Sequence, residues 1–559
     1  NISTKLLKAA AGQAAGGASL DVDEVFSTFL YDGTGSAQTI TNNIDLSGEG
    51  GLVWIKTRTN DVYSGYDNLF FDTERTLGKK LIANSTNAEA SLSNGFTAFN
   101  SNGFSIGSSV ELNSNGEDIV SWTFRKAPKF FDIVTYTGDN TSNRAISHNL
   151  GSTPGMIICK STSSGQWGVW HRSLSGNNGL RLDSTAAAGG SLLHDSSTVN
   201  STSFEVSTGG YVLDNQNQDY VAYLFAHNNN DGGFGPDGDA DIIKCGTCSG
   251  ESGSNRTINL GFEPQWIMTK SVGSGDWRIM DTMRGLLASG TSVSLEANDS
   301  GAEGSDDTLH ITPTGFYVNG LPGSGDYIYM AIRRGPLAAP TDATKVFAID
   351  TRGGTSPTPP TFTSNFVVDF LLYRSDITGT GNWEVRDRIR GEKAKLFTNA
   401  TTAEDADAPN NETEFDQMLG VGSATVAVST RYAWMWKRAP SYFDVVAYSG
   451  NGVSGQQIKH NLGVPPELTL IKNRGTSNNW LALFYAGQLA NSDGWQSSSA
   501  FSDASSYMSS TFPNEATYFG VSANGNAGAS GNNYIAYLFA SVAGVSKVGS
   551  YTGSSSGVV

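Results

Sequence analysis

Apolar residues occur in this chain mostly as short runs, many of them alternating with polar residues. Examples are Gly51-Leu-Val-Trp-Ile-Lys56, Met156-Ile-Ile-Cys-Lys160 and Leu468-Thr-Leu-Ile-Lys472. Clusters of Gly, Ser, Asn, Asp and Pro separate these runs, and most of the 66 glycines fall in the clusters. Short apolar runs with frequent turn residues are typical of the strands of a β-sandwich or a β-barrel. The pattern therefore predicts an all-β protein.

One motif returns along the chain. Its clearest copies are Asp132-Ile-Val-Thr-Tyr136-Thr-Gly138 with His148-Asn-Leu-Gly151, and Asp444-Val-Val-Ala-Tyr448-Ser-Gly450 with His460-Asn-Leu-Gly463. A weaker copy combines Asp241-Ile-Ile-Lys-Cys245 with Asn259-Leu-Gly261, and Val548-Gly-Ser-Tyr551-Thr-Gly553 is similar to the opening of another copy. The chain is therefore a tandem repeat.

Aromatic strands set the period of this repeat. They recur around Trp122, Tyr223, Tyr329, Trp434 and Tyr537, about every 105 residues, whereas propeller blades repeat every 40 to 50 or so. With about eight strands in each repeat, two-sheet sandwiches of jelly-roll type are the first choice. The predicted order is an N-terminal segment at 1–24, sandwiches at 25–129, 130–240, 241–340, 341–440 and 441–543, and the start of a further repeat at 544–559.

Each repeat is long enough to bury a core of its own, so we expect separate domains joined like beads on a string. Arg125-Lys-Ala-Pro128 and Lys437-Arg-Ala-Pro440 are nearly identical joints. The Ala-Pro pair disfavours helix and favours an extended exit, which predicts short, semi-rigid connections. The joint at 228–239 is longer and rich in Asn, Gly and Asp, and it is the expected hinge.

The N-terminal segment carries the one convincing helix pattern of the sequence. Ser3 or Thr4 can cap a helix with Leu6, Leu7, Ala10 and Ala14 on it, and Gly16-Gly17 can end it. Because such a short helix is marginal alone in water, we interpret 1–24 as a docking segment. A frayed tail is the alternative.

The tryptophans divide into a recurrent set and a separate one. Because a residue type that returns in every repeat is best explained by a shared need for burial, we assign the recurrent set to cores. This set is Trp122, Trp167, Trp277, Trp383, Trp434 and Trp480. Trp495 lies in a polar stretch outside the pattern. It is the candidate surface or glycan contact, with packing under a loop as the alternative.

Composition excludes several function classes. There are 36 Lys and Arg against 53 Asp and Glu, a net charge of −17 without any basic run, which disfavours a nucleic-acid partner. No apolar run approaches the length that spans a bilayer, and no secretory signal pattern opens the sequence. Cys245-Gly-Thr-Cys248 lacks a second ligand pair, so we place Cys245 in a strand at the position of Tyr136 and Tyr448 and expect no zinc.

Catalytic and metal motifs are also lacking in the sequence. His148 and His460 lie in the repeated His-Asn-Leu-Gly turn, where a side-chain hydrogen bond to the backbone explains the recurrence. No metal-ligating His spacing, G-x-S-x-G elbow or Walker loop occurs. Asp237-Gly-Asp239-Ala-Asp241 fails the EF-hand test, although a looser calcium site stays open. A distant carboxylate pair for glycoside hydrolysis also stays open. We expect no enzyme activity, cofactor or metal.

The opening Ser3-Thr-Lys-Leu-Leu-Lys-Ala-Ala-Ala11, the joint Phe124-Arg-Lys-Ala-Pro-Lys-Phe-Phe-Asp132 and the His-Asn-Leu-Gly copies together resemble the repeat-bearing virion proteins of marine phages, especially cyanophages. The resemblance implies a particle component that projects from the tail or capsid and meets the host surface. It implies no catalytic residue. The third repeat lacks the His and the fourth lacks the whole His-Asn-Leu-Gly motif.

The leading hypothesis is a structural tail fibre, spike or tail-attached appendage of a marine phage, located in the virion. Its expected partners are other virion proteins at the N-terminus, a host glycan or protein, and further copies of the chain, with a trimer favoured. The alternatives are a virion-associated polysaccharide-degrading enzyme and a secreted bacterial adhesin. If no further chain completes that repeat, we also expect the opening strand at 548–553 to add to the edge of a neighbouring unit or subunit.

Overall fold

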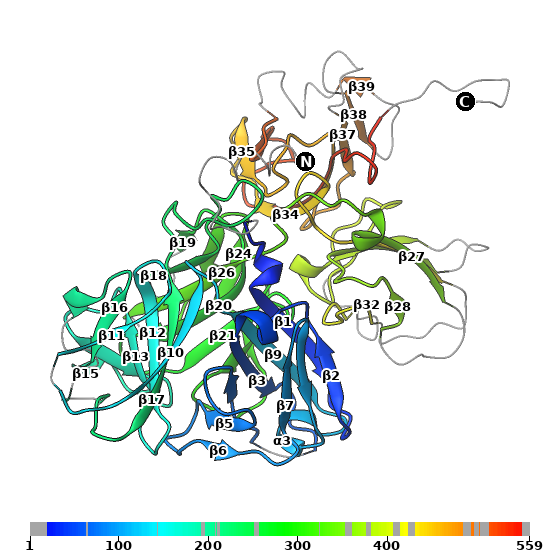
Figure 1. Cartoon of the computed structure of the whole chain (residues 1–559). Helices are drawn as coiled ribbons and strands as arrows, with labels where there is room; N and C mark the ends of the chain where they lie inside the picture. Colours follow the sequence, from blue (N-terminus) through cyan, green and yellow to red (C-terminus); the bar gives the residue numbers. More distant parts are fainter. Residues whose placement is uncertain are drawn as a thin grey trace, which may run out of the picture. The chain divides into compact units, whose positions relative to one another are not determined.

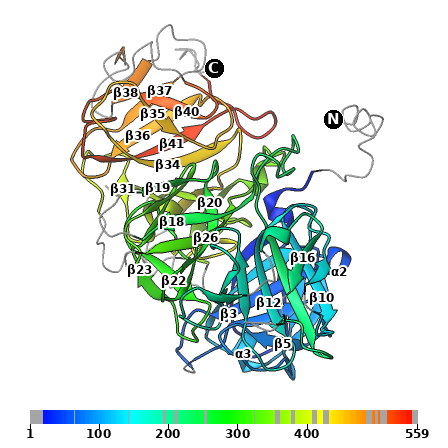
Figure 2. The same cartoon turned by 90° about the vertical axis from the view of Figure 1, so that its left-hand side faces the viewer.

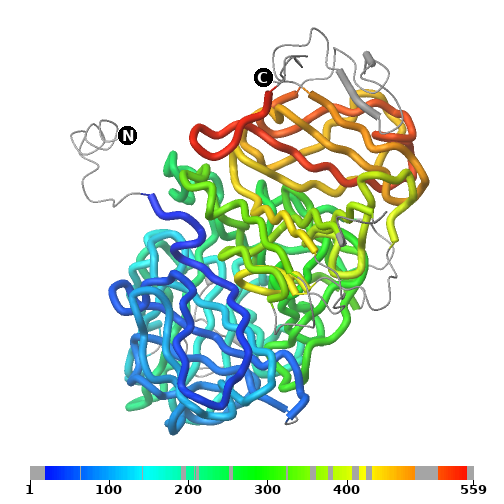
Figure 3. The backbone as a smooth tube through the Cα atoms, turned by 90° about the vertical axis from the view of Figure 1, so that its right-hand side faces the viewer, coloured from blue at the N-terminus to red at the C-terminus, as the bar shows by residue number. Residues whose placement is uncertain are grey.

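The structure is a computed structural model (Figure 1). It describes residues 19–549 except 63–64, 142, 192–195, 207, 209–212, 251–255, 323–324, 353–359, 376–381, 406–413, 423–430, 485–492, 497–501 and 504–513. Nearly all regular elements are strands, and the strand pairs of the described residues are antiparallel. They form five β-sandwiches in tandem, as the repeat predicts. The chain can be followed through them by colour in Figure 3.

The first two sandwiches each combine a six-stranded sheet with a smaller one. In the first, the large sheet is β1 (Phe26–Asp32), β9 (Asp118–Arg125), β3 (Gly51–Thr57), β4 (Leu69–Asp72), β5 (Lys79–Ile82) and β6 (Ala90–Ser91), and the small sheet is β2 (Gln38–Thr41), β8 (Gly103–Ile106) and β7 (Phe96–Asn100). In the second, the large sheet is β10 (Phe131–Thr137), β17 (Asp219–Ala226), β12 (Pro154–Ser161), β13 (Gly168–His171), β14 (Asn178–Arg181) and β15 (Gly189–Ser191), and the small sheet is β11 (Arg144–Ser147) and β16 (Ser203–Val206).

The other three sandwiches repeat this strand order. The third has β18 (Ile243–Ser249), β26 (Asp326–Arg333), β20 (Pro264–Ser271), β21 (Trp277–Asp281), β22 (Ser292–Glu296) and β23 (Gly304–Asp306), with β19 (Arg256–Asn259), β25 (Gly315–Val318) and β24 (Leu309–Thr312). The fourth has β27 (Phe347–Arg352), β33 (Arg431–Trp436), β29 (Phe370–Ser375), β30 (Trp383–Asp387) and β31 (Leu396–Phe397), with β28 (Phe362–Thr363) and β32 (Gly420–Val421). The fifth has β34 (Phe443–Ser449), β41 (Asn533–Phe539), β36 (Leu468–Asn473), β37 (Leu481–Phe484), β38 (Asp493–Gln496) and β39 (Ser502–Asp503), with β35 (Gln456–Lys459) and β40 (Tyr518–Val521).

In every large sheet the last strand of the repeat lies between the first and the third. Figure 2 shows this for β34, β41 and β36 of the fifth sandwich. The described helices are single turns: η1 (Val22–Glu24), α2 (Leu46–Glu49), α3 (Val110–Asn113), η2 (Ser196–Thr198), η3 (Ala343–Lys345) and η4 (Arg388–Arg390). Among the residues described, no helix is long and apolar enough to cross a membrane.

Each sandwich has its own core between its two sheets. In the first, Val53 and Ile55 of β3 meet Ile40 of β2 and Phe104 of β8. Strand β3 is nevertheless buried along its whole length, so its outward residues, such as Trp54, are covered as well. Strands buried on both faces need a further layer on the outside of the sheet. The outer face of the large sheet therefore packs against something beyond its own sandwich.

The described chain divides into two compact units. Unit 1 comprises residues up to 281 together with 293–309 and 318–337, and it holds the first two sandwiches and most of the third. Unit 2 comprises 282–292, 310–317 and the residues from 338 onward, and it holds the fourth and fifth sandwiches. The expected beads on a string are therefore wrong, because sandwiches within a unit share buried contacts instead of only linkers.

The repeated His-Asn-Leu-Gly turn is held by side-chain hydrogen bonds to the backbone, which confirms the structural interpretation of its histidines. His148 accepts the amide hydrogen of Leu150 at Nδ1 (3.3 Å) and pairs through Nε2 with the Asn200 carbonyl oxygen (3.2 Å). His460 repeats both bonds with Leu462 and Glu515. Burial lowers the pKa of both histidines, which favours the neutral ring that these bonds require.

Strand register corrects two sequence alignments. Cys248 pairs with Tyr327 as Tyr136 pairs with Tyr220, so Cys248, and not Cys245, holds the Tyr136 position. Likewise Met330, and not Tyr329, lies at the position of Trp122 and Tyr223. Shifts by an odd number of residues, three for the cysteines and one for Met330, move a side chain to the opposite face of the sheet, and the sequence motif alone was too diverged to fix them. All three cysteines are buried and free.

The joint at 228–239 is a folded loop, so the looseness expected of a hinge is wrong. Asn228 is fully buried, and its side-chain oxygen accepts from the amides of Ile242 and Ile243 (2.9 and 3.2 Å). The Asp241 carboxylate accepts from three backbone amides at residues 230–232. Phe234 is buried against Phe130. These bonds fix the backbone of the joint instead of leaving it to solvent.

The predicted docking residues Leu6, Leu7, Ala10 and Ala14 lie outside the described residues. The described end of that segment, residues 19–24, belongs to unit 1. Val22 is fully buried, and the Asp21 carboxylate accepts from the amide of Leu337 (2.8 and 3.1 Å). Residues 19–24 thus hold the two ends of unit 1 together.

Candidate functional site: the junctions between sandwiches

In unit 1, side chains on the outer faces of the large sheets link each sandwich to both others. One set of hydrogen bonds runs from the central last strand of one sandwich to the fourth strand of another: Tyr223 to Asp72 (2.7 Å), Trp122 to Asp281 (3.1 Å), and the Tyr329 carbonyl to the His171 ring (3.1 Å). Each sandwich therefore presents its last strand to one neighbour and its fourth strand to the other. The contacts close in a cycle of three.

A second set of hydrogen bonds repeats this cycle. Each donor is a side chain four residues before Asp72, His171 or Asp281. Each acceptor is the backbone carbonyl at the end of the fifth strand of the neighbouring sandwich. The three bonds are Asn68 to Glu296 (3.0 Å), Trp167 to Ile82 (2.8 Å) and Trp277 to Arg181 (2.7 Å). The acceptors occupy equivalent positions by strand register. These tryptophans are buried as predicted, but they fill junctions between sandwiches instead of single cores.

A buried lysine recurs beside these bonds. Lys56 donates to the Gly301 carbonyl of the third sandwich (2.8 Å), and Lys270 donates to the Ala186 carbonyl of the second (3.2 Å). Lys160 holds the same position in the second sandwich and is also buried. Burial lowers the pKa of Lys160 and Lys270 to about 8. Their ammonium groups are surrounded by carbonyl oxygens, which supply the hydrogen bonds lost with water.

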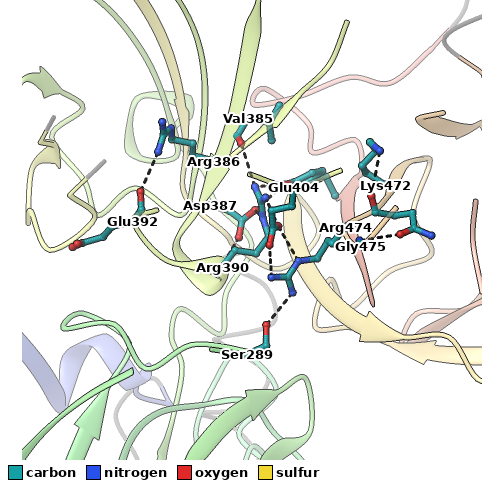
Figure 4. Close-up of polar contacts among 12 residues, drawn as sticks. Ser289, Val385, Arg386, Asp387, Arg390, Glu392, Glu404, Lys472, Arg474 and Gly475 are labelled. Carbon is teal, nitrogen blue, oxygen red and sulfur yellow. Dashed lines mark hydrogen bonds and ion pairs between the residues drawn. The ribbon is translucent and has the colours of Figure 1, made fainter. Parts of the chain in front are cut away.

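Unit 2 has a junction of the same kind, with four charges in one network (Figure 4). Arg390 of the fourth sandwich donates to Asp387 (2.6 Å) and to Glu404 (2.8 Å), and its side chain is fully buried. Arg474 of the fifth sandwich donates to both carboxylate oxygens of Glu404 (2.8 and 2.7 Å). Two positive and two negative groups alternate, so the buried charges are compensated. The bidentate geometry of Arg474 adds directional strength.

The hydroxyl of Tyr537 completes this network from the fifth sandwich. It donates to Asp387 (2.7 Å) and accepts from Arg390 (3.1 Å). The Trp480 indole donates to the Phe397 carbonyl (2.8 Å), as Trp167 and Trp277 do in unit 1. The junction between the first and second sandwiches has four of these five groups, Asp72, Arg75, Glu89 and Tyr223, and carries Thr162 at the position of Arg474.

The electrostatics of the network favour its charged form. Burial alone would raise the pKa of Glu404, but hydrogen bonds from Arg474 and the charge of Arg390 outweigh it, so the pKa lies below its usual value. Burial opposes the charge on Arg390 as well, and Asp387, Tyr537 and Glu404 raise its pKa above the usual value. Burial raises the pKa of Tyr537 far above the usual value, which keeps its hydroxyl protonated as the donor to Asp387. The network is stable as an ion-paired joint.

This arrangement holds surfaces together, and its groups are engaged with one another. In the part of the chain that the structure describes, no group of three or more His, Cys, Asp or Glu side chains could hold a metal ion. Asp237 and Asp239 are exposed, whereas the Asp241 carboxylate accepts backbone amides and pairs with Lys244 (3.3 Å).

Two of the tryptophans assigned to cores are not buried. Trp383 and Trp434 of the fourth sandwich are only half-buried, so that assignment is wrong for them. Trp495 lies in β38, paired with Ala482, and its side chain is outside the description. The charged junction residues were missed in the sequence. A usable signal was the spacing Asp-x-x-Arg, which recurs at Asp72–Arg75, Asp281–Arg284 and Asp387–Arg390.

Comparison with known proteins gives one family. No curated protein matches the chain. A family model described as a domain of unknown function, DUF7483, matches residues 21–336 and again residues 342–558. The first stretch covers the three sandwiches of unit 1 and the second covers the two sandwiches of unit 2. The two matches together span almost the whole sequence, and the chain belongs to the DUF7483 family.

Proposed function

We propose that the chain is a structural virion protein of a marine phage, a tail fibre, spike or tail-attached appendage that takes part in host-surface attachment. The observation that carries the proposal is the repeated junction: at Asp72 and again at Asp387, a carboxylate that is ion-paired within one sandwich accepts a hydrogen bond from a buried tyrosine hydroxyl of the next sandwich. Such joints suit a protein whose task is to keep its shape while it projects from a particle. The resemblance of the sequence to virion proteins supports the location.

The charges of the junctions support a structural role over a catalytic one. Asp387 and Glu404 each accept from a buried arginine, and the lysines donate to backbone carbonyls. Groups held in this way lend stiffness, because separating the fourth and fifth sandwiches would break the Glu404–Arg474 ion pair and the Tyr537–Asp387 hydrogen bond, at a cost of roughly 3–5 kcal/mol for the ion pair. The net charge of −17 keeps a large assembly soluble.

The attachment role adds partners to this proposal. The segment with Leu6, Leu7, Ala10 and Ala14 would dock to other virion proteins, and outward surfaces would meet a host glycan or protein. A trimer is the favoured assembly, and light scattering on the purified chain measures the number of copies. Unit 1 already places three similar sandwiches in a cycle within one chain. A monomer would therefore shift attention to docking on the particle.

The test begins with purified particles. Mass spectrometry should find this chain among the virion proteins, and gold-labelled antibodies against it should mark the tail. Purified chain should also compete with particles for adsorption to host cells, whereas a control β-sandwich protein of similar net charge should not. Absence from purified particles overturns the virion role. Sustained release of reducing ends from host envelope glycan overturns the purely structural role and favours the enzyme.

A further inference from the structure

The fourth sandwich carries an apolar patch on the outer face of its large sheet. Ala433 and Met435 of β33 point into the core of that sandwich, so strand alternation places Trp434 and Trp436 on the opposite face. The patch, named here the fourth-sandwich patch, consists of Phe347, Ile349, Leu372, Trp383, Trp434 and Trp436. Ile349 is 57 % exposed and the others are half-buried. A cluster of exposed and half-buried apolar side chains on one face of a sheet marks a contact surface.

The same positions are covered in the other sandwiches. Strand register aligns Ile349 with Thr28, Ile133, Cys245 and Val445, which are 5, 3, 2 and 2 % exposed. It aligns Trp434 with Trp122, Tyr223, Met330 and Tyr537, all buried. In unit 1 the cover on the Trp122 position is a neighbouring sandwich, whose Asp281 accepts the indole hydrogen. Among the residues that the structure describes, no neighbouring sandwich gives the Trp434 indole an acceptor of this kind.

The polar atoms of the fourth-sandwich patch are indole nitrogens, the same kind of donor that forms hydrogen bonds at the junctions between sandwiches. The indoles of Trp383 and Trp434 hydrogen-bond to none of the described residues; they pack on each other with centroids 5.1 Å apart. The tryptophans at the position of Trp383, which are Trp167, Trp277 and Trp480, all donate to a carbonyl of a neighbouring sandwich, and Trp122 at the position of Trp434 donates to Asp281. A matching sandwich would offer Trp434 a carboxylate at the Asp281 position and Trp383 a strand-end carbonyl.

The chain itself indicates where such a sandwich enters. A five-residue turn with paired backbone hydrogen bonds leads from the first sandwich into the second at 127–131 and from the fourth into the fifth at 439–443. The same turn follows the fifth sandwich, where Val542 and Ser546 exchange hydrogen bonds of 3.1 and 2.9 Å. The residue in its left-handed position is Lys129, Ser441 or Gly544. The family match over unit 2 covers two sandwiches where that over unit 1 covers three.

We propose that a sixth sandwich of the same family, entered through the turn at 542–546, docks on the fourth-sandwich patch. It closes the fourth and fifth sandwiches into a cycle of three like that of unit 1. Its last strand then meets the fifth sandwich at Phe484, which holds the position of Asp72 and Asp387. This surface and its occupant do not depend on the virion role.

The first experiment uses the 559-residue chain and two matched substitutions. Trp434→Asp should lower the melting temperature by no more than about 4 °C, since its side chain is only half-buried, whereas Trp122→Asp places a charge in a closed junction and should lower it by roughly 10 °C or more. Hydroxyl-radical oxidation should modify Trp434 and Trp383 at least about tenfold faster than Trp122 and Trp277. Equal destabilisation by both substitutions, or protection of Trp434 that grows with protein concentration, overturns the proposal.

The second experiment supplies the missing cover. Residues 243–337, the third sandwich, are appended to the chain with Ile243 at the register position of Ser546. Oxidation of Trp383 and Trp434 should then slow by at least about tenfold, and Asp281→Ala in the appended copy should restore part of the rate. Amide exchange reports whether the appended sandwich folds. An appended sandwich that stays unprotected, or a folded one that leaves both indoles reactive, overturns the proposal.

Discussion

Unit 1 and unit 2 use the same junction chemistry but differ in how many junctions they complete. In unit 1 the residues Phe124, Phe225 and Ile332, which hold one position in three sandwiches, are all buried. In unit 2 the same position is filled by Trp436 and Phe539, and both are half-buried. The residues are as apolar in unit 2 as in unit 1. Burial at this position is therefore decided by the neighbouring sandwich and not by the strand that carries it.

The difference in burial between the two units corresponds to a difference in the free energy of unfolding. An aromatic side chain removes roughly 200 Å² from water on burial, worth up to about 5 kcal/mol at 25 cal/mol per Å². Trp122 contributes such a term to unit 1, whereas Trp434 contributes only part of it to unit 2. Unit 2 depends correspondingly more on its polar network, in which Arg390 and Asp387 are both fully buried. The substitutions below separate these two sources of stability.

The largest effect is expected from Asp387→Ala. It removes a carboxylate that pairs with the buried Arg390 and takes the acceptor of the Tyr537 hydroxyl away, which should cost about 3–5 kcal/mol. Asp72→Ala should cost as much in unit 1, because Arg75 and Tyr223 bind it in the same way. Urea unfolding followed by amide exchange assigns each loss to its unit.

The control for this pair is Asp405→Ala in the fourth sandwich. Its ion pair with Lys395 has a carboxylate that is 46 % exposed, so the expected change stays below about 1 kcal/mol. If Asp387→Ala were as mild as this control, the buried network would not be the joint of unit 2.

Acid should weaken the junction of the second and third sandwiches in unit 1 through protonation of His171. Burial lowers the pKa of His171 to about 3, despite its hydrogen bond to the Tyr329 carbonyl, and the charges of Arg172 and His227 lower it further. Because this folded-state pKa is depressed, the stabilisation is complete above the ordinary value of about 6.5 and is lost as the pH falls towards 3. At pH 4.5 the expected loss is about 2–3 kcal/mol.

Comparison with His171→Gln isolates this contribution, since the amide can donate to the same carbonyl and does not titrate. The difference in unfolding free energy between the two proteins should shrink from pH 7 to pH 4.5. A difference that stays constant over that range would show that His171 is not the acid-sensitive group. Unit 2 has Asp387 and Phe484 at this position, so its exchange should not respond to the substitution.

Intermediate effects are expected at the folded joint between the second and third sandwiches. The Asp241 carboxylate accepts three backbone amides, so Asp241→Ala should cost about 1–2 kcal/mol, given its partial exposure. Asp237→Ala and Asp239→Ala are matched controls in the exposed part of the loop and should stay within about 0.5 kcal/mol. Thermal melts with and without added calcium test the looser calcium site. A melting temperature that rises with calcium and loses that rise in Asp237→Ala would establish one.

Much of the fold was readable from the sequence. The run at 51–56 predicts a strand and lies in β3, and the recurrence of His148 at His460 predicts the bonded turn that both form. The outer junctions were not readable, because Asp72 and Arg75 are indistinguishable from solvated charges until a partner from another sandwich is known. One clue was overlooked: in β3 Leu52 and Trp54 are as apolar as Val53 and Ile55, which indicates burial on both faces.

The smallest effect makes the finest distinction between the units. Trp480→Phe keeps the ring but removes the donor to the Phe397 carbonyl, so it should cost about 1 kcal/mol. Trp277→Phe should cost as much in unit 1, where the acceptor is Arg181. Trp383→Phe should cost nearly nothing, because its indole donates to none of the described residues.

Urea midpoints at unchanged slope measure all three substitutions. An equal cost for Trp383→Phe would mean that its indole already has a partner, and the contrast between a closed unit and an open one would then fail at the fourth sandwich. A cost confined to Trp480→Phe and Trp277→Phe would support the contrast between a closed unit and an open one. The same residue type at the same strand position would then contribute to stability only where a neighbouring sandwich accepts its hydrogen bond.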